Sequence, residues 1–394
     1  MSLLIDNGTI FINNKFVKKD ILIENDKIVQ IGTGLSADER IKASGLIVLP
    51  GLIDPHVHLR EPGDTYKEDF VSGSKAAIAG GFTTVLDMPN NKLPTITKER
   101  LEEKRQLAKK AFCDIFFHFG GTEDNFEEVK KANPKSMKLY LGHTTGNMII
   151  SNDAMEEHFK TFPKDRPIVL HACDHNEDEQ AGLKETLSIE KKALEIANIY
   201  DRRIHIAHAS TKDEVSLAKR FPKTTVEVAP HHLFLSQKDY ERLGPLRKVN
   251  PPLRSEQKQI GLWSALDQVD CIATDHAPHT IEDKESGAAG FPGLETSLGL
   301  MMEGCNRGLI DKIWLASRMS QNAADIFGLN DRGRIEQGLL ADLTIIDPKK
   351  EWVVDNTRMY SKCKWTPFDG KKLTGKAKTV IKSGKVVFDH FEFV

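Results

Sequence analysis

Between about residues 51 and 340 the sequence alternates between short apolar runs typical of buried strands and longer amphipathic stretches typical of helices. An apolar run that ends at His58 is followed by seven further candidate strands, at 83–88, 114–119, 137–141, 168–171, 203–208, 225–229 and 271–274. Helical patterns lie between them at 73–78, 97–111, 188–200 and 211–220. Eight strand–helix units predict an α/β fold, a (β/α)₈ barrel of the TIM type, which carries its chemistry at the C-terminal ends of its strands.

The two ends of the sequence are rich in short β patterns. Candidate strands lie at 8–12, 20–23 and 27–32, and again at 342–347, 351–354 and 379–388. We therefore expect a small β-sandwich domain composed of residues 1–50 and 341–394, with the barrel at 51–340 between its two halves.

Composition excludes several classes of protein. The 394 residues include 55 basic and 57 acidic ones, so no basic excess is available for a nucleic-acid backbone. No apolar run reaches the roughly 18 residues of a membrane span, and no secretion signal precedes the first strand. The five cysteines form no CxxC pair, which favours a reducing compartment. We expect a cytoplasmic protein.

The first barrel strand ends in His56-Val57-His58. Residues i and i+2 of a strand point to the same face, so the two imidazoles project together. Such a pair either binds one metal ion or is a buried pair that satisfies its own hydrogen bonds.

The later strand ends favour the metal. They contribute Lys138, His171, His208 and Asp275. A charged residue in an apolar strand is costly unless it is paired or bound to metal. Four histidines, one aspartate and one lysine exceed the needs of one tetrahedral zinc with an open position, and they suit two ions about 3.5–4 Å apart.

Arg60 follows the histidine pair by two residues and lies on the same face if the strand continues. Guanidinium groups form bidentate pairs with carboxylates, so this arginine predicts a substrate carboxylate beside the metals. The alternative is a loop arginine that pairs with Glu61 or Asp64.

Five motifs together resemble those of the dihydroorotases, in the amidohydrolase superfamily. They span 54–63, 87–91, 249–254, 274–279 and 290–296, and the resemblance extends over essentially the whole chain. Arg60 and Asn90 stand at the positions that separate dihydroorotases from allantoinases and hydantoinases.

The resemblance implies a role for each site residue. His56, His58 and Asp275 would hold the more buried metal, His171 and His208 the second, and Lys138 would bridge them after carboxylation of its N6 atom. Zinc is the expected metal. The residues implied in substrate binding are His58, Arg60, Asn90, Asn250, His279, Ala289 and Gly290. Asp275 would accept a proton from the attacking water and pass it to the leaving ring nitrogen.

The implied activity is the reversible hydrolysis of (S)-dihydroorotate to N-carbamoyl-L-aspartate, the third step of de novo pyrimidine (UMP) biosynthesis. A homodimer and an association with aspartate transcarbamylase are compatible with the resemblance. Three alternatives stay open: another cyclic amidase, such as allantoinase or dihydropyrimidinase (hydantoinase), a non-catalytic dihydroorotase-like scaffold for a transcarbamylase, and a simple metal-binding or structural protein. The last of these would not need Arg60 and Asn90 beside the ligands.

Other histidines receive lesser roles. His205 lies three residues before His208, so we expect it to be packed behind the site. His231 and His232 are expected near the mouth, and His158 and His390 at the surface, while His143 has no assigned role. The segments 144–146 and 287–290 are candidates for a loop that closes over the substrate.

Overall fold

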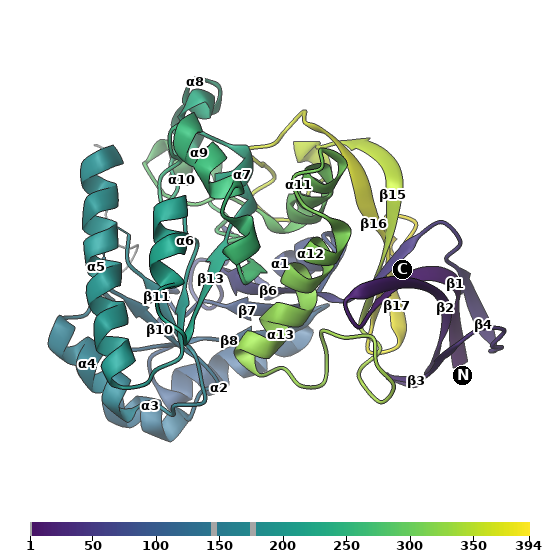
Figure 1. The fold of residues 1–394 in the computed structure, drawn as a ribbon, viewed down its shortest axis with the longest axis horizontal. Helices are drawn as coiled ribbons and strands as arrows, with labels where there is room; N and C mark the ends of the chain where they lie inside the picture. Colours follow the sequence, from purple (N-terminus) through teal and green to yellow (C-terminus); the bar gives the residue numbers. More distant parts are fainter. Residues whose placement is uncertain (1, 143–147, 174–178) are drawn as a thin grey trace.

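The computed structural model describes residues 2–142, 148–173 and 179–394. Figure 1 shows a barrel surrounded by helices and, at its right, a β domain that contains both the N and the C mark. His143 and the candidate closing loop 144–146 lie outside the described residues.

The predicted parallel barrel is confirmed. Its strands are β6 (Leu52–Val57), β7 (Phe82–Asp87), β8 (Asp114–Phe117), β9 (Phe119–Gly120), β10 (Met137–Tyr140), β11 (Ile168–His171), β12 (Ile204–Ile206), β13 (Thr224–Val228) and β14 (Cys271–Ile272). β8 and β9 share one barrel position, because only His118 separates them. Hydrogen bonds join β6, β7 and β8, and then β9 to β14 in chain order. A parallel bridge between Val57 and His276 links the last strand to the first.

Helices connect the barrel strands. They are α1 (Phe70–Ala79), α2 (Lys98–Leu107), α3 (Phe126–Ala132), α4 (Asn152–Thr161), α5 (Glu179–Ile199), α6 (Lys212–Ala218), α7 (Pro230–Phe234), α8 (Tyr240–Leu243), α9 (Glu256–Trp263), α10 (Ile281–Glu285), α11 (Leu294–Asn306), α12 (Lys312–Ala316) and α13 (Asn322–Phe327). Thr97 and Thr211 cap α2 and α6, where their side chains accept backbone N–H groups that have no partner inside the helix. None of the helices among the described residues has the length and apolar character of a membrane span.

Strands from both ends of the chain form the β domain. They are β1 (Ser2–Ile12), β2 (Lys15–Glu24), β3 (Lys27–Gly32), β4 (Glu39–Lys42), β5 (Ile47–Pro50), β15 (Leu343–Val353), β16 (Lys372–Lys382), β17 (Lys385–Asp389) and β18 (Glu392–Phe393). Hydrogen bonds run through them in the order β18-β17-β16-β15-β5-β1-β2-β3, with β4 beside β1. The sheet folds over a shared core that contains Ile5, Ile21 and Ile345, which gives the expected sandwich.

Several predicted boundaries were wrong. The two strands expected at 342–347 and 351–354 are the single strand β15, whose pairing with β16 shifts register between Asp347 and Glu351. The run 379–388 divides between β16 and β17, because Ser383 and Gly384 form a turn with positive φ. α5 begins at Glu179, well before the expected 188, and β14 ends at Ile272, before the expected 274.

The β domain and the barrel meet through helix α11, which contacts β16. Gly299 of α11 allows this approach, since a Cβ atom there would lie 2.8 Å from the Trp352 ring. The contact fixes the β domain beside the eighth barrel position, which precedes α11.

Candidate metal centre and substrate pocket

The six predicted metal ligands meet at the C-terminal end of the barrel. His56 belongs to β6, Lys138 to β10 and His171 to β11, while His208 and Asp275 follow β12 and β14. The His56 and His58 Nε2 atoms lie 3.4 and 3.1 Å from the same oxygen, Asp275 Oδ1. Across the pocket, His171 Nδ1 lies 2.8 Å from His208 Nε2. The structure therefore brings together two groups of ligand atoms.

The groups surround a small, partly open cavity. Its lining contains eleven of the twelve predicted site residues, together with two that were not predicted, Tyr140 and Ala277: His56, His58, Arg60, Asn90, Lys138, Tyr140, His171, His208, Asn250, Asp275, Ala277, Ala289 and Gly290. His279 lies behind Arg60, with its Nε2 3.0 Å from Arg60 Nη2.

Burial sets the charge of these groups. It lowers the pKa of His56, and with the nearby Arg60 it lowers that of His58 far more. Burial and His171 likewise hold the His208 pKa well below its usual range. Neutral imidazoles result, which is the form that binds metal. Burial lowers the pKa of the Lys138 ammonium to about 8 and raises that of Asp275.

The donor set fits a metal centre. His56, His58 and Asp275 place one ligand atom each within 4.8 Å of one another. The buried Lys138 Nζ and His208 Nδ1 have no hydrogen-bond partner among the described residues. A buried polar or charged group without a partner is costly. The two unpartnered nitrogen atoms therefore favour a bound group that interacts with them.

Three site residues have backbone conformations that non-glycine residues rarely adopt. The φ angles of Arg60, His208 and Asp275 are +64°, +39° and +49°. Such conformations cost about 1–3 kcal/mol each and persist where the surrounding structure imposes them, most often at functional sites. They turn each side chain into the pocket after its strand has ended. Arg60 therefore does not extend the β6 face, as the sequence suggested, since β6 ends at Val57.

The substrate side of the pocket begins at Arg60. Its Nε donates to Pro278 O at 3.1 Å, and neither Glu61 nor Asp64 holds it in an ion pair within the described residues. Gly290 lies opposite with φ +143°, and a Cβ there would lie 2.5 Å from Ala277 O. Only glycine therefore lets this backbone approach the site so closely.

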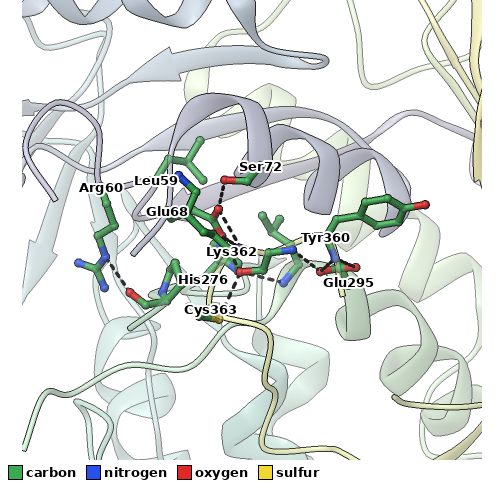
Figure 2. Close-up of polar contacts among 12 residues, drawn as sticks. Leu59, Arg60, Glu68, Ser72, His276, Glu295, Tyr360, Lys362 and Cys363 are labelled. Atoms are coloured by element: carbon green, nitrogen blue, oxygen red, sulfur yellow. Dashed lines mark hydrogen bonds and ion pairs between the residues drawn. The ribbon is translucent and has the colours of Figure 1, made fainter. Parts of the chain in front are cut away.

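A polar network beside the barrel connects the loop after β14, which contains His276, to the segment 360–363 (Figure 2). Glu68 is buried and accepts from Ser361 Oγ at 2.5 Å, while its Oε2 lies 3.4 Å from His276 Nε2. Glu295 accepts the backbone N–H groups of Tyr360 and Ser361 at 2.9 and 3.0 Å. The segment between β15 and β16 thus supports His276, the neighbour of Asp275.

Sequence reasoning missed Glu227 and Tyr140. Glu227 is fully buried on β13, and its carboxylate accepts from the His56 side chain and from His205. A charged residue within the apolar run 225–229 was a usable signal. Tyr140 lies two residues after Lys138, so the strand period places it on the same face.

Four further histidines lie outside the pocket, three of them buried and one exposed. His205 and His118 are packed behind the site. His118 Nε2 donates to Pro55 O at 2.9 Å, and His205, which contacts Glu227, lies where it was expected. His158 was expected at the surface, but it is buried, because it lies on the inner side of α4 and donates to Thr122 O at 2.8 Å. His390 is exposed, as expected.

Comparison with known proteins assigns the chain to a class. The model of the amidohydrolase family matches residues 47–387. A dihydroorotase from Pyrococcus horikoshii is 41% identical over 98% of this chain and 92% of its own length. The multifunctional protein CAD of Squalus acanthias is 37% identical over 87% of this chain, which corresponds to 15% of that protein. The L-hydantoinase (dihydropyrimidinase) of Arthrobacter aurescens has a TM-score of 0.95 at 28% identity, with 100% and 97% of the two chains covered.

The chain belongs to the amidohydrolase family, whose members are metal-dependent enzymes. Within that family its sequence similarity is to dihydroorotases over nearly the whole chain, which confirms the resemblance seen in the motifs around His56, Asn90 and Asp275.

Proposed function

We propose that this protein catalyses the reversible hydrolysis of (S)-dihydroorotate to N-carbamoyl-L-aspartate, the dihydroorotase reaction of pyrimidine biosynthesis. The observation that carries the proposal is the position of Arg60 and Asn90 in the same cavity as the six ligands. A cyclic amide with a carboxylate on its ring requires both a hydrolytic centre and an anion-binding group beside it. The dihydroorotase relatives support the same conclusion.

We assign two divalent ions, with zinc as the expected metal, to these ligands. His56, His58 and Asp275 would hold one and His171 and His208 the other, with Lys138 as an N6-carboxylated bridge. A neutral amine adds CO₂, and the lowered pKa of Lys138 enlarges its neutral fraction. When bound, the ions lower the pKa of a water molecule and polarise the substrate carbonyl.

The chain's own residues supply the other steps. Asp275 is held beside His56 and His58, where its carboxylate is placed to take a proton from water and return it to the ring nitrogen. Arg60, Asn90 and His279 would hold the ring carboxylate. Asn250 and the backbone at Ala289 and Gly290 would contact the ring edge.

A second candidate is hydantoin or dihydropyrimidine hydrolysis, favoured by the fold match to the L-hydantoinase. Hydantoin and dihydrouracil lack the ring carboxylate, so they leave Arg60 without its anion. Purified protein of known metal content should be assayed with dihydroorotate, dihydrouracil, hydantoin and allantoin. We expect dihydroorotate to be preferred at least about 30-fold in kcat/KM. This factor corresponds to the free energy lost when one partner of a buried charge pair is absent.

Turnover of hydantoin without turnover of dihydroorotate would overturn the proposed substrate. A metal-loaded protein with no turnover of any ring would instead favour the non-catalytic scaffold. A cytoplasmic homodimer and an association with aspartate transcarbamylase are also proposed, the latter because a segment of a multifunctional protein matches this chain. Light scattering and co-purification with the transcarbamylase would test these two.

A further inference from the structure

Glu227 lies on β13, the seventh barrel position, directly beneath the ligands. Its side chain is buried within the barrel and is not part of any of the motifs that resemble the dihydroorotases. Its carboxylate nonetheless accepts from three donors, which come from His56 on β6, His205 on β12 and His208 just after β12.

One oxygen of Glu227 joins the two groups of ligands. Oε1 accepts from His56 Nδ1, in the first group, and from the backbone N–H of His208, in the second, at 3.1 Å. A histidine that donates one ring N–H to a carboxylate has its tautomer and ring orientation fixed, with the lone pair of the other nitrogen available. This contact therefore turns His56 Nε2 toward Asp275.

The backbone contact acts on the second group. His208 has a φ of +39°, a conformation that needs support from its surroundings. The hydrogen bond from its N–H to Glu227 supplies such support at the residue itself. If it were lost, the chain after β12 would be free to relax, and the His208 imidazole would move with it.

The other oxygen fixes the carboxylate itself. Oε2 accepts from His205 Nε2 at 2.9 Å, and His205 Nδ1 lies 2.8 Å from Thr225 Oγ1. His205 and Thr225 thus anchor the outer end of a chain of contacts that runs through Glu227 to His56. This series of contacts gives a role to His205, which is buried but does not line the pocket.

We propose that Glu227 is a positioning residue for both metal positions, acting through the His56 side chain and the His208 backbone. The proposal rests on the ligand assignment of the proposed function. It predicts that metal affinity, and not only folding stability, depends on this carboxylate. A purely structural role in the barrel core would lower the stability of the metal-free protein and leave metal affinity unchanged.

The test measures zinc affinity by competition with a chelator, and the unfolding temperature of the metal-free and zinc-loaded proteins. Glu227→Gln keeps the shape but removes the charge, and we expect zinc affinity to fall by about 10–100-fold, the usual effect of losing a partner of a metal-bound histidine. Glu227→Asp keeps the charge on a shorter side chain and should retain more affinity than Gln. Asp20→Asn is the matched control, because Asp20 is a buried carboxylate of the β domain that accepts the backbone N–H groups of Asn7 and Leu35.

Zinc affinity at the wild-type level in Glu227→Gln, with a lowered unfolding temperature of the metal-free form, would overturn the proposal. If Glu227→Gln does not fold, His205→Gln provides the same test by releasing the outer oxygen; a smaller loss of affinity, on the order of threefold to tenfold, supports the proposal, and no loss refutes it. These readouts use no substrate. A wild type that binds zinc but does not hydrolyse dihydroorotate would therefore refute the proposed function and leave the role of Glu227 standing.

Discussion

His58 Nδ1 lies 2.8 Å from the side-chain oxygen of Asn90. The imidazole N–H donates to this oxygen, so the other ring nitrogen, Nε2, faces Asp275 at 3.1 Å. The contact also orients Asn90. Its oxygen is engaged by the histidine, and its NH₂ group, which can only donate, remains for a carboxylate in the pocket. Asn90 therefore links a proposed metal ligand, His58, to the proposed substrate anion.

Asn90→Asp separates these two roles. The aspartate keeps an oxygen for His58 but replaces the donor with a negative charge that repels the substrate carboxylate. We expect kcat/KM for dihydroorotate to fall roughly 30-fold or more, while metal content stays near wild type. Asn90→Ala removes both contacts and should lower metal affinity as well. An unchanged KM in Asn90→Asp would show that Asn90 does not contact the substrate.

Arg60 is expected to determine substrate choice. Lysine cannot reproduce its two parallel hydrogen bonds to a carboxylate, and losing one partner of a desolvated pair costs about 2–5 kcal/mol. Arg60→Lys and Arg60→Met should therefore lower kcat/KM for dihydroorotate by roughly 30-fold or more, with normal metal content. Hydrolysis of dihydrouracil, measured beside it, should fall much less. Equal losses on both substrates would indicate that Arg60 supports the site's structure and does not select the substrate.

Lys138→Ala removes the proposed bridge. We expect lower metal content by elemental analysis and a loss of activity on the order of 10² or more, since a metal ion supplies several kcal/mol of stabilisation. Added acetate or propionate should restore part of both, because a free carboxylate can occupy the vacated position. The exposed Lys135→Ala is the control. Full metal occupancy and normal turnover in Lys138→Ala would rule out the bridge.

Asp275→Asn tests proton transfer. The amide retains the size of the side chain but cannot accept a proton from water. We expect kcat to fall by about 10²–10⁴, as is typical of general acid–base groups. Turnover of the variant within about twofold of wild type would contradict the assignment.

His118 should make stability depend on pH. Burial lowers its pKa from 6.5 to about 3, so below pH 6.5 the unfolded chain binds a proton that the folded chain does not. The contribution of His118 to the free energy of unfolding is therefore greatest above pH 6.5, and it is lost as pH falls toward 3. Between pH 7.5 and 5.5 the loss is about 1.4 kcal/mol.

His118→Gln should remove that part of the pH dependence in denaturant unfolding of the protein at the two pH values. His390→Gln, at an exposed position, is the control and should behave as wild type. If the difference in stability between His118→Gln and wild type is the same at both pH values, His118 is not buried in its neutral form.

The barrel, and the meeting of the proposed ligands at one end of it, could be predicted because strand period and chain order determine them. His56 and His58 share a face by spacing alone, and each later ligand ends an apolar run. The positive φ angles of Arg60 and Asp275 could not be foreseen, since non-glycine residues adopt them only under the constraint of the folded structure. The partner of Glu227 was equally hidden, because β6 and β13 meet only in the closed barrel. The burial of His158 was not predicted, because a polar side chain on an amphipathic helix can be buried when it donates a hydrogen bond to a carbonyl, here that of Thr122.

The pairing of β5 with β15 sets an order on the assembly of the protein. Pro50 lies opposite Leu343, so the whole barrel is synthesised between two strands that are neighbours in the sheet. Until β15 leaves the ribosome, β5 presents an unpaired edge, and such edges promote association with other chains. Contacts so distant in sequence also form slowly. Newly made chains should therefore pass through a stage in which the barrel's first strand, β6, is attached to an open sheet that is vulnerable to aggregation.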